Sequence, residues 1–427
     1  MLSYRKLAMR VLGRPLHTGG NDSPRPASQR AAAFILTAAM LITLSAPAFA
    51  GTWCIDEGNI TVKAGDTKGK NTVSQGNKKD VEDTNTIITG TSNENTVTID
   101  TSKGNVDVTF DDLNIDASSR NNAAVSVTGS GNTTIKLNGD NALKSDIYRS
   151  GISSSGSLTI SGGENDSLTA QGGSGANGIS SSGSLTISGG TVTATGGNST
   201  GIVGYGGSGI YSSSGVAISG GAVTANGGDS KDGYGGNGIY SSSVAISGGT
   251  VKAAGGNGKD GSGGNGISST STTISGGTVT ANGGSGNSSG GNGIHSNGVT
   301  ISGGTVNAAG GDGGNGKDGG DGIISNDIDL SGSLELTAKA GSPNGKALSR
   351  ADSELDLDTI KEKLDPGAKV TAINANGDSK QVSIPRPVEP EESSSSSDGG
   401  SAAPSAPASS LPGLTVTDKS GAVISYT

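Results

Sequence analysis

From about residue 151 to residue 341 the chain repeats one pattern of hydrophobic and polar positions. Each copy contains three short segments, Gly-Ile-x-Ser, Leu/Val-x-Ile-Ser and Thr-Val-x-Ala, in which apolar residues alternate with polar ones. A period of two predicts β-strands with one buried face. The isoleucine of the first segment recurs every 27 to 31 residues, at positions 152, 179, 210, 239, 267, 294 and 323.

One such copy is too small to bury a face alone, whereas stacked copies bury a continuous core. Each isoleucine would then lie on the isoleucine of the next copy, about 4.8 Å away. The repeat therefore predicts an all-β protein, a parallel β-helix solenoid with three faces and 27–31 residues per rung. The Gly-Gly pairs that follow Ile-Ser suit its corners. The copies differ in length mainly after Thr-Val-x-Ala, which predicts a glycine-rich ridge along one edge.

The flanking regions follow the pattern less closely. Residues 51–150 contain short β-branched segments separated by Asn, Gly and Asp, and we expect further β-helix rungs there. Residues 342–385 predict a C-terminal cap, with a short helix over 358–364 and strands over 369–373 and 381–384. Residues 386–410 are rich in Pro, Ser and acidic residues and predict a disordered linker. Residues 411–427 resume a strand pattern and predict a short β tail.

The first fifty residues predict a secretory signal peptide. A basic segment precedes an apolar run over 31–47, and Ala48-Phe49-Ala50 is typical of a cleavage site. The alternative is an uncleaved membrane anchor, but the run is short for a membrane span and Pro47 ends it. We therefore expect a secreted or cell-surface protein with no membrane insertion after cleavage.

Composition and charge narrow the range of partners. Glycine accounts for 77 of 427 residues and aromatic residues for only 3%, so a regular repeat rather than a large apolar core must stabilise the fold. The formal net charge of −9 becomes −14 once residues 1–50, with a net charge of +5, are removed. An acidic chain without a basic stripe argues against nucleic acid and anionic membranes as partners. The oligomeric state stays open.

Few residues are suited to catalysis. Beyond residue 50 the chain has one histidine, His295, and one cysteine, Cys54, which we interpret as a free thiol. Metal clusters and histidine-based triads are therefore nearly excluded. An active site should be singular, whereas the charged pairs in the loops recur from rung to rung.

Those charged pairs include Asp232, Asp260 and Asp318, each preceded by lysine. The loops around Asp260 and Asp318 match the first six positions of the calcium-binding nonapeptide repeat, although the next apolar position is missing. Calcium held by these carboxylates and by carbonyl oxygens is one hypothesis, and a solvated loop with weak ion pairs is the other. We expect no other cofactor.

An outward column gives the most specific hint of function. The residues after Gly-Ile would point outward, one above another, and they include Tyr211, Tyr240 and His295. Tyr205 and Tyr234 lie in the preceding loops. Tyrosines beside Ser and Asn suit stacking on sugar rings, and the alternative is an exposed aromatic ladder that only stabilises the sheet.

With these residues in view, the chain resembles secreted bacterial proteins built from Ile-Ser-Gly-Gly-Thr-Val-type repeats, of the type labelled carbohydrate-binding-domain-containing. Residues 111–115 and 135–143 and the Ile-Ser-Gly-Gly copies carry the resemblance. It implies a right-handed parallel β-helix of the pectate-lyase-like class that binds carbohydrate. We expect a glycan, or a host or cell-wall surface, as the partner. We predict a non-catalytic, adhesin-like binding module. The alternatives are a polysaccharide lyase or hydrolase of the same fold and a purely structural surface spacer.

Overall fold

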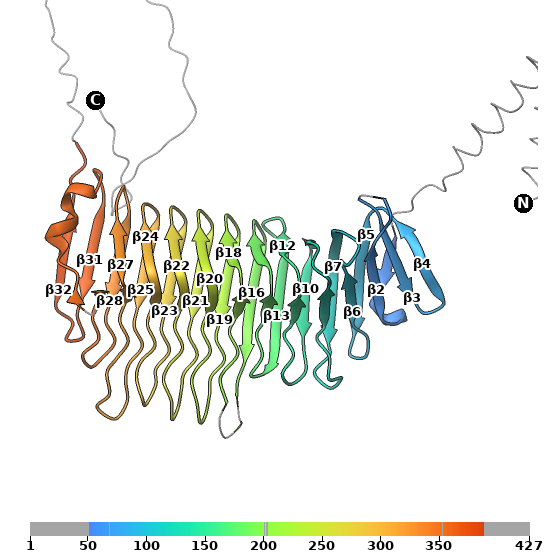
Figure 1. Ribbon diagram of the computed structural model, residues 1–427, viewed down its shortest axis with the longest axis horizontal. Coiled ribbons are helices and arrows are strands. Elements are labelled where there is room, and N and C mark those ends of the chain that lie inside the picture. Colours follow the sequence, from blue (N-terminus) through green and yellow to red (C-terminus); the bar gives the residue numbers. More distant parts are fainter. Residues whose placement is uncertain (1–50, 68, 200, 202–203, 352, 388–427) are drawn as a thin grey trace, which may run out of the picture. The chain divides into compact units, whose positions relative to one another are not determined.

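A computed structural model describes residues 51–387 except 68, 200, 202–203 and 352. The predicted signal peptide, nearly all of the predicted linker and the predicted β tail lie outside these residues. The described chain is a parallel β-helix, as the repeat predicted, with strands stacked side by side along one axis (Figure 1). Among the described residues no helix is long and apolar enough to cross a membrane.

Three columns of parallel strands form the solenoid. The first column consists of β2 Ile60–Ala64, β6 Val97–Asp100, β8 Val125–Thr128, β11 Ile152–Ser154, β14 Ile179–Ser181, β17 Ile210–Ser212, the first halves of β20 Ile239–Ile246, β22 Ile267–Ile274 and β24 Ile294–Ile301, and then β26 Ile323–Ser325 and β29 Leu348–Arg350.

The second column consists of β1 Thr52–Cys54, the first halves of β5 Thr86–Ser92 and β7 Val106–Asp116, β9 Thr133–Asn138, β12 Leu158–Ser161, β15 Ser184–Ile187, β18 Gly215–Ile218, the second halves of β20, β22 and β24, and β27 Asp327–Leu330.

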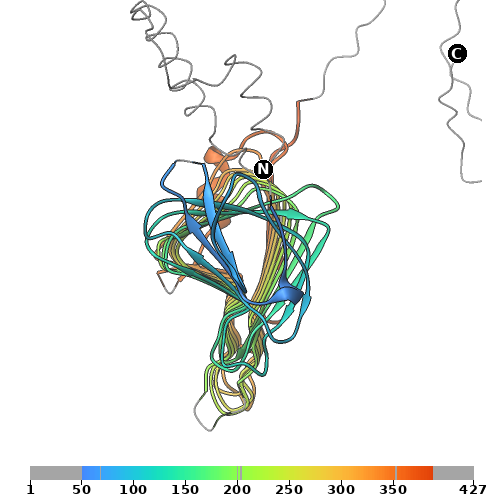
Figure 2. The ribbon, with the colours of Figure 1, turned by 90° about the vertical axis from the view of Figure 1, so that its right-hand side faces the viewer.

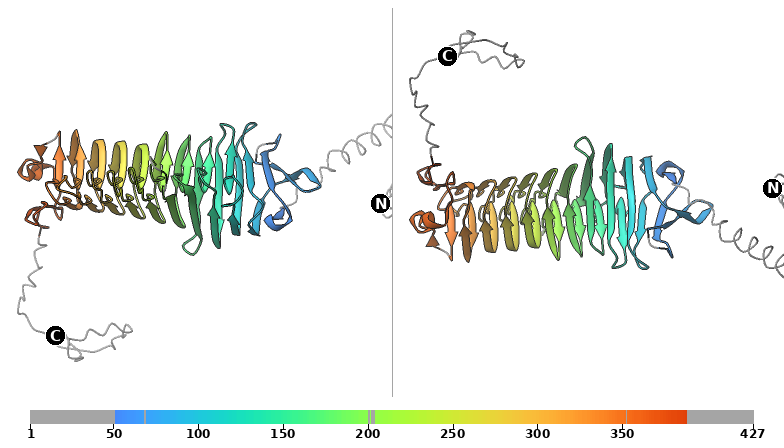
Figure 3. Two further views of the ribbon diagram at one scale, coloured as in Figure 1. Left: turned by 90° about the horizontal axis from the view of Figure 1, so that it is seen from below. Right: turned by 90° about the horizontal axis from the view of Figure 1, so that it is seen from above.

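The third column consists of the second halves of β5 and β7, β10 Asp140–Lys144, β13 Ser167–Ser174, β16 Thr191–Gly197, β19 Ala222–Asn226, β21 Thr250–Ala254, β23 Thr278–Asn282, β25 Thr305–Ala309, β28 Glu335–Lys339 and β31 Lys369–Ile373. The regular rungs follow one another closely along the axis (Figure 3).

The core is a set of stacked aliphatic side chains. The isoleucines that open the first-column strands pair in register, for example Ile210 with Ile239 and Ile239 with Ile267, and they have no exposed surface. Each buried side chain of this size contributes about 1.5–3 kcal/mol. The predicted corners are also present: the second glycine of successive Gly-Gly pairs, from Gly190 to Gly304, has φ between +77° and +80°, where side chains are disfavoured.

The predicted glycine-rich edge is a narrow extension of the solenoid, seen at the bottom of Figure 2. We call it the glycine ridge. It comprises the described residues of 196–209, 227–238, 255–266, 283–293 and 310–322, which connect each third-column strand to the next first-column strand. Every loop runs out along one leg and returns along a second.

Antiparallel strands close both ends of the solenoid. Near the N-terminus, β3 Asn71–Gln75 pairs antiparallel with β2, and β4 Lys78–Asp83 pairs antiparallel with β3. Near the C-terminus, β30 Ser353–Glu354 pairs antiparallel with β29, and β32 Ser379–Ser383 with β31. Two 3-10 helices complete the fold, η1 Ile55–Glu57 and η2 Leu357–Lys363, and η2 lies close to the helix predicted over 358–364.

Candidate functional site

The predicted outward column exists. In the first-column ladder Tyr211 lies opposite Tyr240 on the next strand, and the isoleucine before each tyrosine is buried, so the two rings emerge on the outer face. Their centroids are 5.7 Å apart and their planes differ by 53°. Tyr240 is 46% exposed. The pair therefore presents aromatic surface to solvent on two adjacent rungs.

A second tyrosine pair lies on the return legs of the glycine ridge. The rings of Tyr205 and Tyr234 stack with centroids 5.3 Å apart and planes within 7° of parallel. They are 63% and 51% exposed. The backbone is in register here as well, because the Gly206 N–H donates to the Tyr234 carbonyl at 2.9 Å. The sequence placed these tyrosines in the loops but did not predict that they stack.

His295 follows the Tyr211–Tyr240 pair along the same ladder. Tyr240 lies opposite Ser268, and Ser268 lies opposite His295. Two ladder steps, about 10 Å, therefore separate Tyr240 from His295. The histidine is exposed but is not part of the aromatic pair. His295 lies on the same outer face of the first column, two rungs beyond Tyr240.

Five residues connect each ridge tyrosine to the tyrosine that follows it on the face. Between Tyr234 and Tyr240 lies Asn237, whose side-chain oxygen accepts a hydrogen bond from the Asn265 N–H at 2.9 Å. The Asn265 side chain accepts from the Asn292 N–H at 2.8 Å in the same way. This ladder of amides holds the return legs in register, which in turn fixes the spacing of the tyrosines.

We call Tyr205, Tyr211, Tyr234, Tyr240 and His295 the tyrosine surface. Its neighbours in the ladder are mostly Ser, Asn and Gly. Exposed tyrosine rings combine a flat apolar body with a polar tip. Such a surface is suited to the apolar face of a ring that carries hydroxyl groups at its edge, and it offers no group arranged for acid–base or nucleophilic chemistry.

The structure does not gather the three aspartates of the calcium hypothesis. Asp232, Asp260 and Asp318 occupy separate loops of the ridge, and the Asp318 carboxylate accepts from the side-chain amide of Asn344 at 2.9 Å. No group of three or more His, Cys, Asp or Glu side chains in the described part of the chain is placed to hold a metal ion. Calcium at these loops stays a prediction.

Sequence reasoning missed a polar groove beside the N-terminal hairpin. Its volume is about 800 Å³, and it lies between the turns that contain Lys70 and Lys103 and the outer faces of β7, β9 and β12. Asp107 and Lys136 line it from neighbouring strands. Unlike the loop charges, these residues do not recur from rung to rung. Alternation along β7 and β9 places both on the outer face, which is the signal that would have found them.

The groove is held open by a buried side chain. Asn71 on β3 donates to the Thr86 hydroxyl at 2.9 Å and to the Asp107 carbonyl at 2.7 Å. At the rim, Lys103 pairs with Asp66 at 3.3 Å across two turns. The N-terminal hairpin is therefore fixed against the second column, and it forms one wall of the groove.

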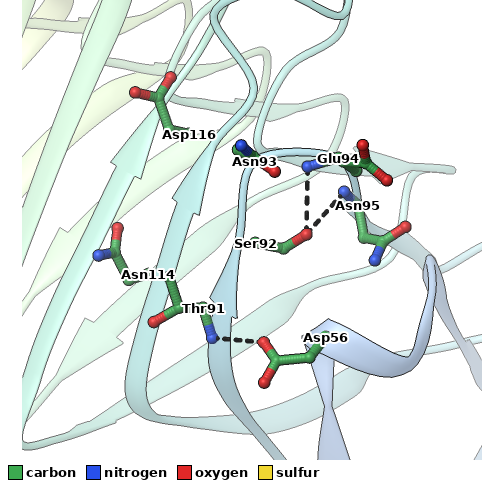
Figure 4. A pocket seen from close by; sticks show the side chains of 8 residues that line it. All are labelled: Asp56, Thr91, Ser92, Asn93, Glu94, Asn95, Asn114 and Asp116. Carbon is green, nitrogen blue, oxygen red and sulfur yellow. Dashed lines mark hydrogen bonds between the residues drawn. The ribbon is translucent and has the colours of Figure 1, made fainter.

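A second pocket of about 560 Å³ lies beside η1 and the ends of β5 and β7 (Figure 4). Its polar groups are largely engaged in local structure. The Asp56 carboxylate accepts from the Thr91 N–H at 2.8 Å, and the Ser92 hydroxyl accepts from two following backbone N–H groups. These contacts stabilise turns. They account for the polar side chains of the pocket, and no ligand is needed to explain them.

Comparisons with known proteins identify no relative of this chain. No protein-family model, no curated protein and no solved structure matches the chain. The parallel strand register described above is what establishes the fold class.

Proposed function

We propose that the protein is a secreted or cell-surface β-helix that binds glycans through the tyrosine surface without cleaving them. The observation that carries this proposal is the pairing of tyrosines on the outer surface of adjacent rungs, twice, in a chain with only 3% aromatic residues. The resemblance to Ile-Ser-Gly-Gly repeat proteins of the carbohydrate-binding type supports it. So does the predicted signal peptide, because surface glycans are found outside the cell.

Stability alone accounts poorly for this arrangement. Cross-strand aromatic pairs contribute roughly 0.2–1 kcal/mol to a sheet, and the neighbouring rungs form the same ladder with Ser180 and Ser268 in these positions. Three of the four rings, Tyr205, Tyr234 and Tyr240, stay exposed and gain little from burial. Recognition of a flat, hydroxyl-bearing ring gives them a role that serine cannot fill.

The proposal predicts that the double variants Tyr211→Ala/Tyr240→Ala and Tyr205→Ala/Tyr234→Ala lose glycan binding. Each lost stacking contact costs about 0.5–1.5 kcal/mol, so a double variant should bind about tenfold to one hundredfold more weakly. Binding of the unaltered protein is first mapped on a glycan array. Affinities for the glycans that it retains are then measured by titration calorimetry.

The matched control is Ser180→Ala/Ser268→Ala, which alters the residues on either side of Tyr211 and Tyr240 in the same column. It should bind like the unaltered protein. If the tyrosines served only as a ladder, the tyrosine variants would melt at lower temperature and bind as before. An array on which the unaltered protein binds no glycan contradicts the proposal and leaves the surface spacer as the better account.

The groove favours a second candidate, a polysaccharide lyase or hydrolase. Charged residues of both signs, Asp107 and Lys136 among them, line this cleft without recurring along the repeat. A digest of acidic and neutral polysaccharides distinguishes the candidates. New reducing ends or unsaturated sugars that disappear in Asp107→Asn would establish an enzyme, and an unchanged digest favours the binding module.

A further inference from the structure

Tyr148 is the most exposed of the large apolar or aromatic residues in the described chain, at 79%. It lies between β10 and β11, in the loop that precedes the first rung of the regular repeat. The five described tyrosines all belong either to the tyrosine surface or to this loop. No Gly-Ile-x-Ser copy places Tyr148 in the outward column, so the repeat alone does not single it out.

The backbone aligns Tyr148 with the ridge. Its N–H donates to the Ser174 carbonyl at 3.2 Å, just as the Gly206 N–H donates to the Tyr234 carbonyl two rungs further on. By the register of the first column, Ser174 occupies the place of Tyr205 one rung earlier. By the same register Tyr148 lies opposite Gly175, the residue after Ser174. It therefore stands two rungs before Gly206, the residue that directly follows Tyr205.

Gly175 connects the two tyrosines. A Cβ built on Gly175 would lie 3.7 Å from Cε1 of the Tyr148 ring and 3.4 Å from the Tyr205 carbonyl oxygen. The Tyr148 ring thus reaches over the intervening rung toward the rung of Tyr205. Serine and glycine stand on that intervening rung, so no large side chain separates the rings.

Folding alone does not explain this residue. Tyr148 has φ of +60°, in the left-handed region that costs a non-glycine residue about 1–2 kcal/mol. Asp146 fixes the turn by accepting from the backbone N–H groups of Asn121 and Ile147. A strained backbone that exposes an aromatic ring is a feature typical of functional sites.

We propose that Tyr148 extends the ridge pair into a row of three rings, Tyr148, Tyr205 and Tyr234, that binds a linear neutral glycan lying along the solenoid axis. This inference rests on the proposed function. The row spans three ladder steps, about 14 Å, so a chain of several sugars is needed to reach all three rings. A net charge of −14 beyond residue 50 disfavours anionic polysaccharides.

The test uses neutral oligomers of β-1,4-linked glucose and of β-1,4-linked N-acetylglucosamine, from disaccharide to octasaccharide. Tyr148→Ala should leave disaccharide affinity unchanged and weaken octasaccharide binding about threefold to tenfold. Tyr148→Phe keeps the ring and should bind like the unaltered protein at every length. Val81→Ala, which trims an exposed apolar residue on β4, is the matched control.

The two proposals fail in different ways. If the unaltered protein binds the octasaccharides and Tyr148→Ala binds them equally well, the row is overturned while the tyrosine surface stands. Equal weakening at every length also overturns the row, because it means that Tyr148 acts on a single-sugar site or on the fold. If the unaltered protein binds none of the oligomers, the neutral linear glycan is overturned together with the row.

Discussion

Serine fills one inward position of the first column from β11 to β26, where the earlier rungs have Val62, Ile99 and Val127. Ser154, Ser181, Ser212, Ser241, Ser296 and Ser325 are all buried. Two of their hydroxyls reach the corner of the preceding rung: Ser181 donates to the Gly156 carbonyl at 2.9 Å, and Ser212 to the Gly183 carbonyl at 2.8 Å. These side chains are small enough for the corner, and they satisfy carbonyls that the turn leaves without a ladder partner.

Asp116, which lines the pocket in Figure 4, should make the stability of the fold depend on pH. Hydrogen bonds from Ser118 lower the pKa of Asp116, and the Lys144 ammonium at 3.2 Å acts in the same direction. A lowered pKa in the folded state stabilises the fold above the unfolded pKa of about 3.8, and this contribution is lost as the pH falls through the folded value. The side chain is half exposed, so the effect is small.

We expect Asp116→Asn to melt at a lower temperature than the unaltered protein at pH 7 and at the same temperature near pH 2, since protonation removes the charge in both states. Thermal unfolding followed by circular dichroism at the two pH values provides the comparison. A melting difference that is equally large at both pH values would show that the carboxylate charge is not the cause.

At the scale of elements, the glycine ridge is held together by hydrogen bonds that alternate between its two legs. The Gly256 N–H donates to Gly236, Gly264 to Gly256, Gly284 to Gly264 and Gly291 to Gly284, each at 2.8 Å. A Cβ on any of these glycines would lie closer than 3.0 Å to a carbonyl carbon or oxygen of another leg. The ridge is therefore an ordered double layer that only glycine can form.

Gly284→Ala should destabilise the protein by about 1–3 kcal/mol, as overpacking does elsewhere, because its methyl group would meet the Gly256 carbonyl. The control is Gly298→Ala on β24, where no atom lies within 4 Å of the added methyl group. That change should be neutral or stabilising by up to about 1 kcal/mol. Chemical denaturation of both variants measures the difference, and equal stabilities would mean that the ridge tolerates side chains.

Alternation of apolar and polar residues was enough to predict the three columns, because Ile, Val and Ala mark the buried face in every copy. The same rule could not predict the inward serines, since it counts Ser181 as polar whether or not its hydroxyl finds a carbonyl. Nor could it predict the ordered legs of the ridge, where glycine gives no side-chain pattern. The β4 strand begins with Lys78 and Lys79 and is mostly exposed, so it carried no hydrophobic signal.

Sequence also predicted the neighbours in the outward column, because register follows from the repeat: Tyr211 and Tyr240 occupy equivalent positions. It could not predict the parallel stacking of Tyr205 and Tyr234, which depends on the path of loops of unequal length. The groove required tertiary information, since Lys70 and Lys136 come together only when the N-terminal hairpin folds against β9.

At the scale of the whole molecule, each rung contacts mainly the rungs before and after it. Stability in such a stack is approximately a sum of rung and nearest-neighbour terms. Ile267 and Ile294 occupy equivalent positions in the first column, so residues 267–293 form one complete turn of the solenoid. Removing this turn joins Gly266 to Ile294 and places strands of the same column next to each other.

We therefore expect the protein that lacks residues 267–293 to fold and to retain its β-sheet circular dichroism. Removal of residues 267–280 is the control, because it deletes part of a turn and sets strands of different columns against each other. That protein should fail to fold cooperatively. Cooperative melting of both proteins would contradict the picture of independent, interchangeable rungs.

The antiparallel strands at the two ends have a consequence for polymerisation. A stack of identical parallel rungs is a template for its own growth, since each end exposes strands ready to accept another. At one end β4 and at the other β30 and β32 run in the opposite direction to their neighbours. At the C-terminal end an incoming rung would meet strands of the wrong polarity, and at the N-terminal end it would meet the β3–β4 hairpin in place of a complete rung. Fibre growth would therefore have to wait for a cap to unfold. The number of repeats in the gene, and not a self-assembly reaction, then sets the length of the rod.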